Sequence, residues 1–122
     1  MQAHRNPFLV AIKTSTEVCD AAKKYLDQAQ ELTNAARASV LHYDLLKQMD
    51  KNSLEQRHRT TLAITRAEKY VNDKIEILFK LDFSKYDDQT EILIDQHREA
   101  LEDVEKELED MHKFVDEIDQ RP

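Results

Sequence analysis

The feature that most constrains this chain is the absence of glycine from all 122 residues, together with only two prolines, Pro7 and Pro122. Glycine supplies the unusual backbone angles and close ligand approach of phosphate-binding loops, dinucleotide-binding turns, nucleophile elbows and EF-hand loops. The sequence therefore excludes these sites. What remains is typical of a helical interaction module, whose partner and pathway the sequence does not name.

The first helix is predicted over about residues 7–50. Asn6 is a favourable N-cap and Pro7 suits the first helical position. Small residues recur every seven positions, flanked by two further seams. The small seam is Ser15, Ala22, Ala29 and Ala36, and the flanking seams are Val18, Tyr25, Leu32, Ser39 and Cys19, Leu26, Thr33, Val40. A stripe this wide can contact two neighbouring helices.

A second helix is predicted over about residues 53–81, because Ser53 and Gln56 have the spacing of a capping box. No glycine or proline separates Gln48 from Ser53, so one continuous rod through both helices stays an alternative. The expected inward positions are Ile64, Ala67, Val71, Ile75 and Leu78, preceded at comparable positions by Arg57, His58 and Thr61.

The third helix, about residues 88–119, has the clearest pattern. Asp88 and Glu91 have capping-box spacing, and apolar positions then recur alternately four and three apart. The seam is Ile94, His97, Leu101, Val104, Leu108, Met111, Val115 and Ile118. We place a loop before it, at residues 81–88.

Together these patterns predict an all-α fold: an up-down-up antiparallel three-helix bundle or coiled coil with a long first helix, forming one domain over residues 1–122. The architecture is similar to that of spectrin repeats and syntaxin N-terminal domains, although the sequence lacks the tryptophan that usually marks a spectrin core. The resemblance extends to the fold alone.

Charge is unevenly distributed. Residues 1–80 carry 13 Lys and Arg against 10 Asp and Glu, a formal charge of +3, whereas residues 81–122 carry 5 against 15, or −10. An acidic third helix either lies beside the mildly basic middle helix or docks a basic partner. The total of −7 disfavours nucleic acid and anionic lipid as partners.

A cytoplasmic location is expected. Cys19 has no second cysteine for an internal disulfide, and the apolar run Phe8–Ile12 is too short for a secretory signal. No apolar stretch approaches the roughly 20 residues that cross a bilayer.

Catalytic and metal-binding motifs are sparse in the sequence, so we expect no enzyme, no cofactor and no metal. Glu55–His58 and Glu109–His112 have the spacing of di-iron helical bundles, but further inward Glu ligands are not evident. Cys19 is expected to pack as a small apolar residue. His97 is expected inside the seam as an interior residue with its hydrogen bonds satisfied. The alternative is that its protonation loosens the bundle in mildly acidic conditions.

Asn6-Pro7-Phe8 is similar to the tripeptide that EH domains of endocytic adaptors bind. The alternative is a capped helix start with Phe8 packed on the bundle.

The expected function is a non-enzymatic protein–protein interaction or scaffolding domain, such as an adaptor in trafficking, cytoskeletal or assembly machinery. The alternative is a membrane-associated helical dimer resembling BAR-type modules. Its lipid-facing cations would be Lys51, Arg57, Arg59, Arg66, Lys69 and Lys74.

The partner is expected at the start of the first helix. That helix would be ~65 Å long and the second ~43 Å, so the second should end level with about Ala22. The uncovered apolar residues are Phe8, Leu9, Ile12, Val18 and Cys19. A homodimer or a docked partner helix would bury them. Alternatively, the helix kinks, or the loop at residues 82–88 covers them with Phe83 and Tyr86.

Overall fold

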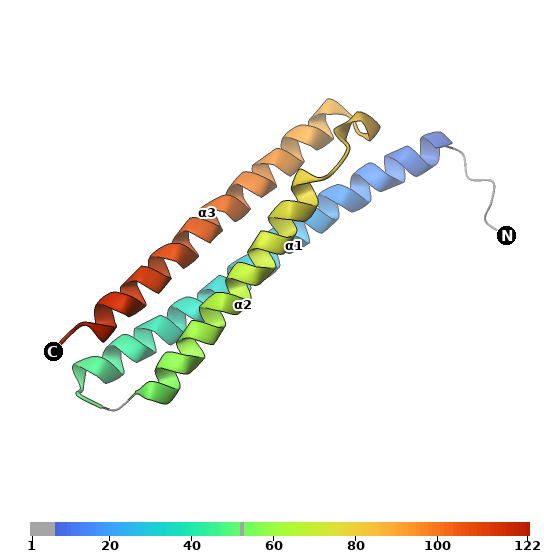
Figure 1. Ribbon diagram of the computed structural model, residues 1–122. Coiled ribbons are helices and arrows are strands. Elements are labelled where there is room, and N and C mark those ends of the chain that lie inside the picture. Colours follow the sequence, from blue (N-terminus) through green and yellow to red (C-terminus); the bar gives the residue numbers. More distant parts are fainter. Residues whose placement is uncertain (1–6, 52) are drawn as a thin grey trace.

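The computed structural model describes residues 7–51 and 53–122, with side chains from Ser15 onward. Three helices pack against one another: α1 (Pro7–Gln48), α2 (Leu54–Phe79) and α3 (Asp88–Asp119), with a short 3₁₀ helix, η1 (Phe83–Lys85), between the last two. Figure 1 shows α2 running back along α1, and α3 returning beside both. The predicted all-α three-helix bundle with a long first helix is confirmed.

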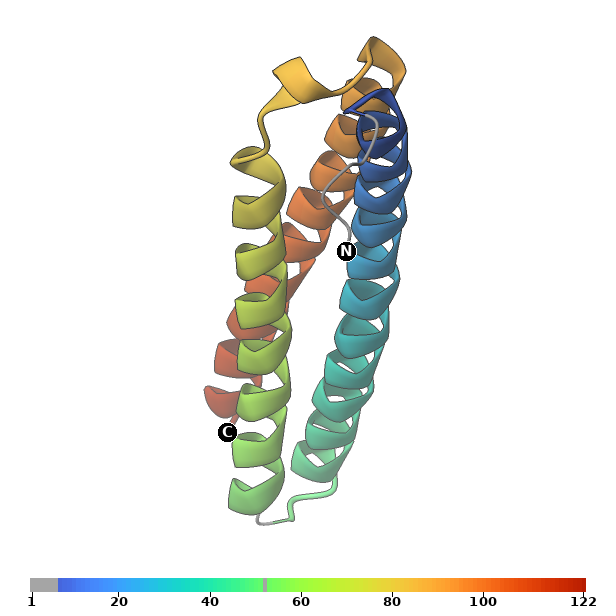
Figure 2. The same ribbon diagram turned by 90° about the vertical axis from the view of Figure 1, so that its right-hand side faces the viewer.

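Two contacts fix the register of α2 against α1. The Ser39 hydroxyl of α1 lies 2.9 Å from the Thr60 hydroxyl of α2. Fourteen residues toward the N-terminus of α1, and fourteen toward the C-terminus of α2, Lys74 Nζ lies 4.9 Å from the centre of the Tyr25 ring. At this constant register Phe79, the last residue of α2, lies level with about Asp20. The N-terminal part of α1 therefore runs past the end of α2, as both Figure 1 and Figure 2 show.

The core follows the predicted seams. Ala22, Ala29 and Ala36 are fully buried on α1, and the predicted inward positions of α2 are buried except for the half-buried Ile75. On α3, seven of the eight seam positions are buried, as the heptad predicts.

His97 is the exception, and its prediction as an interior residue is wrong. The ring is half-buried, with Nδ1 2.7 Å from the Leu93 carbonyl oxygen of its own helix. The next residue, Arg98, stacks on Phe79, the end of α2, so His97 lies where the covering helix stops.

A turn separates α1 from α2, so the two are not one continuous rod. The Lys51 N–H donates to the Leu46 carbonyl and the Asp50 N–H to the Lys47 carbonyl, while Asp50 adopts φ 55°. This is a Schellman motif, in which a left-handed residue, usually glycine, ends the helix. Asp50 takes the place of glycine here.

The Ser53 capping box is wrong, because the Ser53 side chain makes no cap hydrogen bond. Gln56 instead turns inward, where its Nε2 donates to the Ser39 carbonyl at 3.2 Å and to the Ser39 hydroxyl at 3.0 Å. The Ser39 hydroxyl and Gln56 Nε2 also hydrogen-bond the buried Thr60 hydroxyl, at 2.9 and 3.3 Å.

The α2–α3 connection lies where a loop is predicted. Leu81 and Phe83 pack against the core, and Asp82 accepts a hydrogen bond from the Ser84 N–H. The cap of α3 is Asp87, which accepts from the Thr90 N–H at 2.7 Å, so the predicted Asp88–Glu91 capping box is one residue late. Among the described helices, none is both long and apolar enough to cross a membrane.

Candidate functional site

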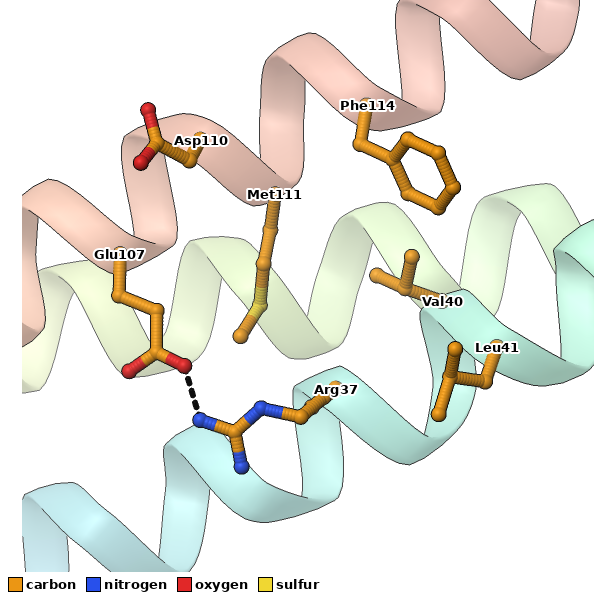
Figure 3. A pocket seen from close by; sticks show the side chains of 7 residues that line it. All are labelled: Arg37, Val40, Leu41, Glu107, Asp110, Met111 and Phe114. Carbon is orange, nitrogen blue, oxygen red and sulfur yellow. Dashed lines mark hydrogen bonds and ion pairs between the residues drawn. The ribbon is translucent and has the colours of Figure 1, made fainter.

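A shallow groove runs between α1 and α3 near the α1–α2 turn. Figure 3 shows its walls: Val40 and Leu41 on α1 face Met111 and Phe114 on α3. Its volume is about 220 Å³, smaller than the roughly 300–1,000 Å³ of small-molecule pockets. The groove has room for a large side chain of a partner rather than for a cofactor.

Exposed apolar side chains continue the α1 wall toward the turn. Leu41 is 59% exposed, and Leu45 and Met49, four and eight residues further on, are each 52% exposed. Residues four apart lie on one helix face, so these three form a strip, which we call the α1 strip. Single exposed leucines are ordinary, whereas a strip beside a groove is typical of a docking surface.

Sequence reasoning missed this surface. Leu41, Leu45 and Met49 follow four-residue spacing but fall outside the seven-residue seams used to predict the core. Hydrophobic residues outside the predicted seams were the available signal.

Two paired cations lie at the groove. Arg37 on α1 forms an ion pair with Glu107 on α3, drawn as the dashed line in Figure 3. Arg121, after α3, pairs with Asp44 and lies 5.8 Å from the centre of the Phe114 ring. Both guanidinium groups are therefore neutralised by carboxylates of the bundle itself.

The outer edge of α3 beside the groove is acidic. Four exposed carboxylates follow this edge, with the exposed Lys106 and Lys113 within one turn of them: Glu99, Asp103, Asp110 and Glu117. None of them forms an ion pair with the described residues. In Figure 3 the Asp110 carboxylate points outward from the α3 wall, away from the Arg37 pair. We call these four residues the acidic edge.

A second hollow extends the groove along the bundle. It is lined by Gln30, Thr33, Asn34, Arg37, Val104 and Glu107, and shares the Arg37–Glu107 pair with the first. Each wall of this hollow carries one charged side chain, Arg37 on α1 and Glu107 on α3, and the remaining lining residues are uncharged.

The predicted strip at the start of α1 is only partly described. Phe8, Leu9 and Ile12 lie outside the described side chains, as does the tripeptide Asn6–Phe8, so both hypotheses stay predictions. Val18 is half-buried and packs against the core, and Cys19 is a half-buried free thiol. Phe83 also contacts the core, whereas its predicted contact with the strip lies outside the described part.

The two Glu–His pairs do not face one another across the bundle. His112 lies 2.6 Å from Glu68 on α2, and Glu109 points to solvent. Glu55 pairs with Arg59 at 2.7 Å, while His58 is exposed. Among the described residues, no group of three or more His, Cys, Asp or Glu side chains could hold a metal ion.

Several cations of the proposed lipid-facing surface are engaged within the bundle. Arg57 donates to Asp119 at 2.7 Å, and Arg59 pairs with Glu55. Lys74 lies 4.9 and 5.1 Å from the ring centres of Tyr25 and Tyr70.

One polar cluster joins all three helices near the C-terminal end of α3. The Tyr43 hydroxyl on α1 donates to Asp119 Oδ1 on α3, and Arg57 Nε on α2 donates to Asp119 Oδ2. Burial, reinforced by the Asp119 carboxylate, raises the pKa of Tyr43, and the hydrogen bond to Asp119 raises the pKa of Arg57. This three-helix clasp holds the ends of the bundle beside the groove.

Comparison with known proteins gives no match, either to a family model, to a curated protein or to a solved structure.

Proposed function

We propose that this chain is a non-enzymatic protein–protein interaction domain that docks an α-helix in the groove between α1 and α3. The observation that carries the proposal is the α1 strip, which leaves Leu41, Leu45 and Met49 exposed beside an apolar groove. In this role the domain acts as a scaffold or adaptor in the cytoplasm, in agreement with the composition and the single cysteine.

Burial supplies the driving force. Fully burying a Leu or Met side chain contributes ~1.5–3 kcal/mol, and the three strip residues are at present about half exposed. An amphipathic helix offers apolar side chains at the three- and four-residue spacing that matches such a strip. Amphipathic helices of this kind commonly bind in hydrophobic grooves.

Site-specific photocrosslinking in the cells that make the protein tests this function. Leu41→benzoylphenylalanine places the crosslinker at the groove, and Arg66→benzoylphenylalanine, at an exposed position of α2, is the control. We expect a discrete adduct from position 41 whose mass exceeds that of the chain by that of another protein.

Three results are informative. An adduct found only at position 41 supports the proposal, and an adduct of twice the chain mass identifies the partner as a second copy. No adduct at position 41, or the same adducts at both positions, contradicts a docking role for the groove.

A further inference from the structure

The groove has a charge asymmetry that bears on the chemistry of its occupant. The α3 side presents the acidic edge, none of whose four carboxylates pairs with the described residues. The α1 side presents uncharged groups: Gln30, Asn34 and the α1 strip. Arg37 and Arg121, the two cations at the groove, are already paired with Glu107 and Asp44. The exposed Lys106 and Lys113 lie within one helical turn of these carboxylates, so the outer face of α3 carries four carboxylates of the acidic edge against two lysines. An occupant therefore meets net negative charge along this edge.

The spacing of the acidic edge matches a helix lying along the groove. Asp103, Asp110 and Glu117 are seven residues apart, so they repeat every ~10.5 Å along α3. A helix running beside α3 brings one side chain to that edge at the same seven-residue interval. Cations at these positions would each face one carboxylate.

We propose that the groove selects a basic amphipathic helix of another protein. Its apolar face packs on the α1 strip, Val40 and Phe114, and Lys or Arg at seven-residue intervals lies beside the acidic edge of α3. This inference rests on the proposed docking function and adds the chemistry of the partner.

A second copy of this chain fits the groove less well. Each copy carries a formal charge of −7, and residues 81–122 alone carry −10. Two copies meeting through this surface would bring their acidic edges into one interface, where like charges repel. A partner with the opposite charge gains attraction from the same carboxylates.

Binding of designed helical peptides tests the inference. The probe is a fluorescent 21-residue peptide with leucines along one face and lysines at seven-residue intervals along one edge. One control peptide has glutamate in place of each lysine, and another has the same composition in scrambled order. Fluorescence anisotropy at low salt and at physiological salt gives the affinities.

Matched protein variants locate the binding. Asp103→Asn/Asp110→Asn removes two charges from the acidic edge, and Glu31→Gln/Asp73→Asn removes two exposed charges elsewhere. We expect the first pair to weaken binding of the lysine peptide about two- to five-fold for each charge and the second pair to leave it nearly unchanged. Leu41→Gln should weaken every amphipathic peptide. Circular dichroism confirms that these exposed substitutions leave the helices folded.

Other outcomes overturn the inference in distinguishable ways. If the scrambled peptide binds equally, the attraction is only general charge. If the glutamate peptide binds as well and Leu41→Gln weakens both, the docking function stands but the basic partner is wrong. If no peptide binds, the inference fails and photocrosslinking judges the docking function separately. A dimer that Leu41→Gln dissociates assigns the groove to a second copy.

Discussion

Alanine sets the distance between α1 and its neighbours. Ala22, Ala29 and Ala36 are fully buried at seven-residue spacing, so no side chain beyond a methyl group separates this face of α1 from the helices around it. The Thr33 hydroxyl, also buried, donates to the Ala29 carbonyl at 2.7 Å and needs no other partner. Larger residues in this seam would push the helices apart.

Ala29→Leu should therefore destabilise the bundle through overpacking. We expect a loss of about 1–3 kcal/mol in the free energy of unfolding. Ala35→Leu, at an exposed position of the same helix, should change it by less than about 0.5 kcal/mol. Chemical denaturation of both variants makes the comparison. Equal effects at the two positions would show that the seam tolerates a larger residue.

Two aspartates determine where helices end and begin: Asp50 at the end of α1 and Asp87 at the start of α3. Asp50 ends α1 in the left-handed conformation, which costs a β-branched residue roughly 1–2 kcal/mol and costs glycine little. Asp50→Val should thus lower stability by about that amount, whereas Asp50→Gly should keep or slightly raise it. Lys51→Val, one residue later, is the matched control because Lys51 has no positive φ. If both valine variants unfold alike, the conformation of Asp50 carries no strain.

The start of α3 should respond to acid through Asp87. Hydrogen bonds from the Thr90 side chain and backbone N–H hold the pKa of Asp87 below its usual range. A lowered pKa in the folded state means that this stabilisation is present above the unfolded pKa of about 3.9 and is lost as the pH falls through the folded pKa.

Asp87→Asn keeps an acceptor for the Thr90 N–H but cannot take up a proton. Denaturation curves from pH 7 to pH 2.5 should show a constant stability difference from the parent protein above about pH 5. Below about pH 4 the difference should shift in favour of the variant. A difference that stays constant to pH 2.5 would exclude Asp87 as a source of acid sensitivity.

At the scale of the molecule, local periodicity predicts the bundle and leaves its long-range polar contacts hidden. The heptad of α3 and the alanines of α1 identify the core because burial repeats with the helix period. The partners of Asp119 lie 76 and 62 residues away in sequence, and no spacing rule connects them. The groove also depends on packing, since Leu41 and Phe114 line it together only after α1 and α3 pack, although the four-residue spacing of the α1 strip is visible in the sequence.

The three-helix clasp gives the last prediction. Asp119→Ala removes the acceptor of the Tyr43 hydroxyl and leaves Arg57 without its carboxylate, so we expect a loss of about 1–3 kcal/mol in stability. Tyr43→Phe removes only the hydroxyl and should cost about 0.5–1.5 kcal/mol. Because the two groups share one hydrogen bond, the double variant should lose less than the sum of the single losses. Glu109→Ala, an exposed carboxylate of α3, serves as the control. Additive losses in chemical denaturation would mean that Tyr43 and Asp119 do not stabilise the bundle through each other.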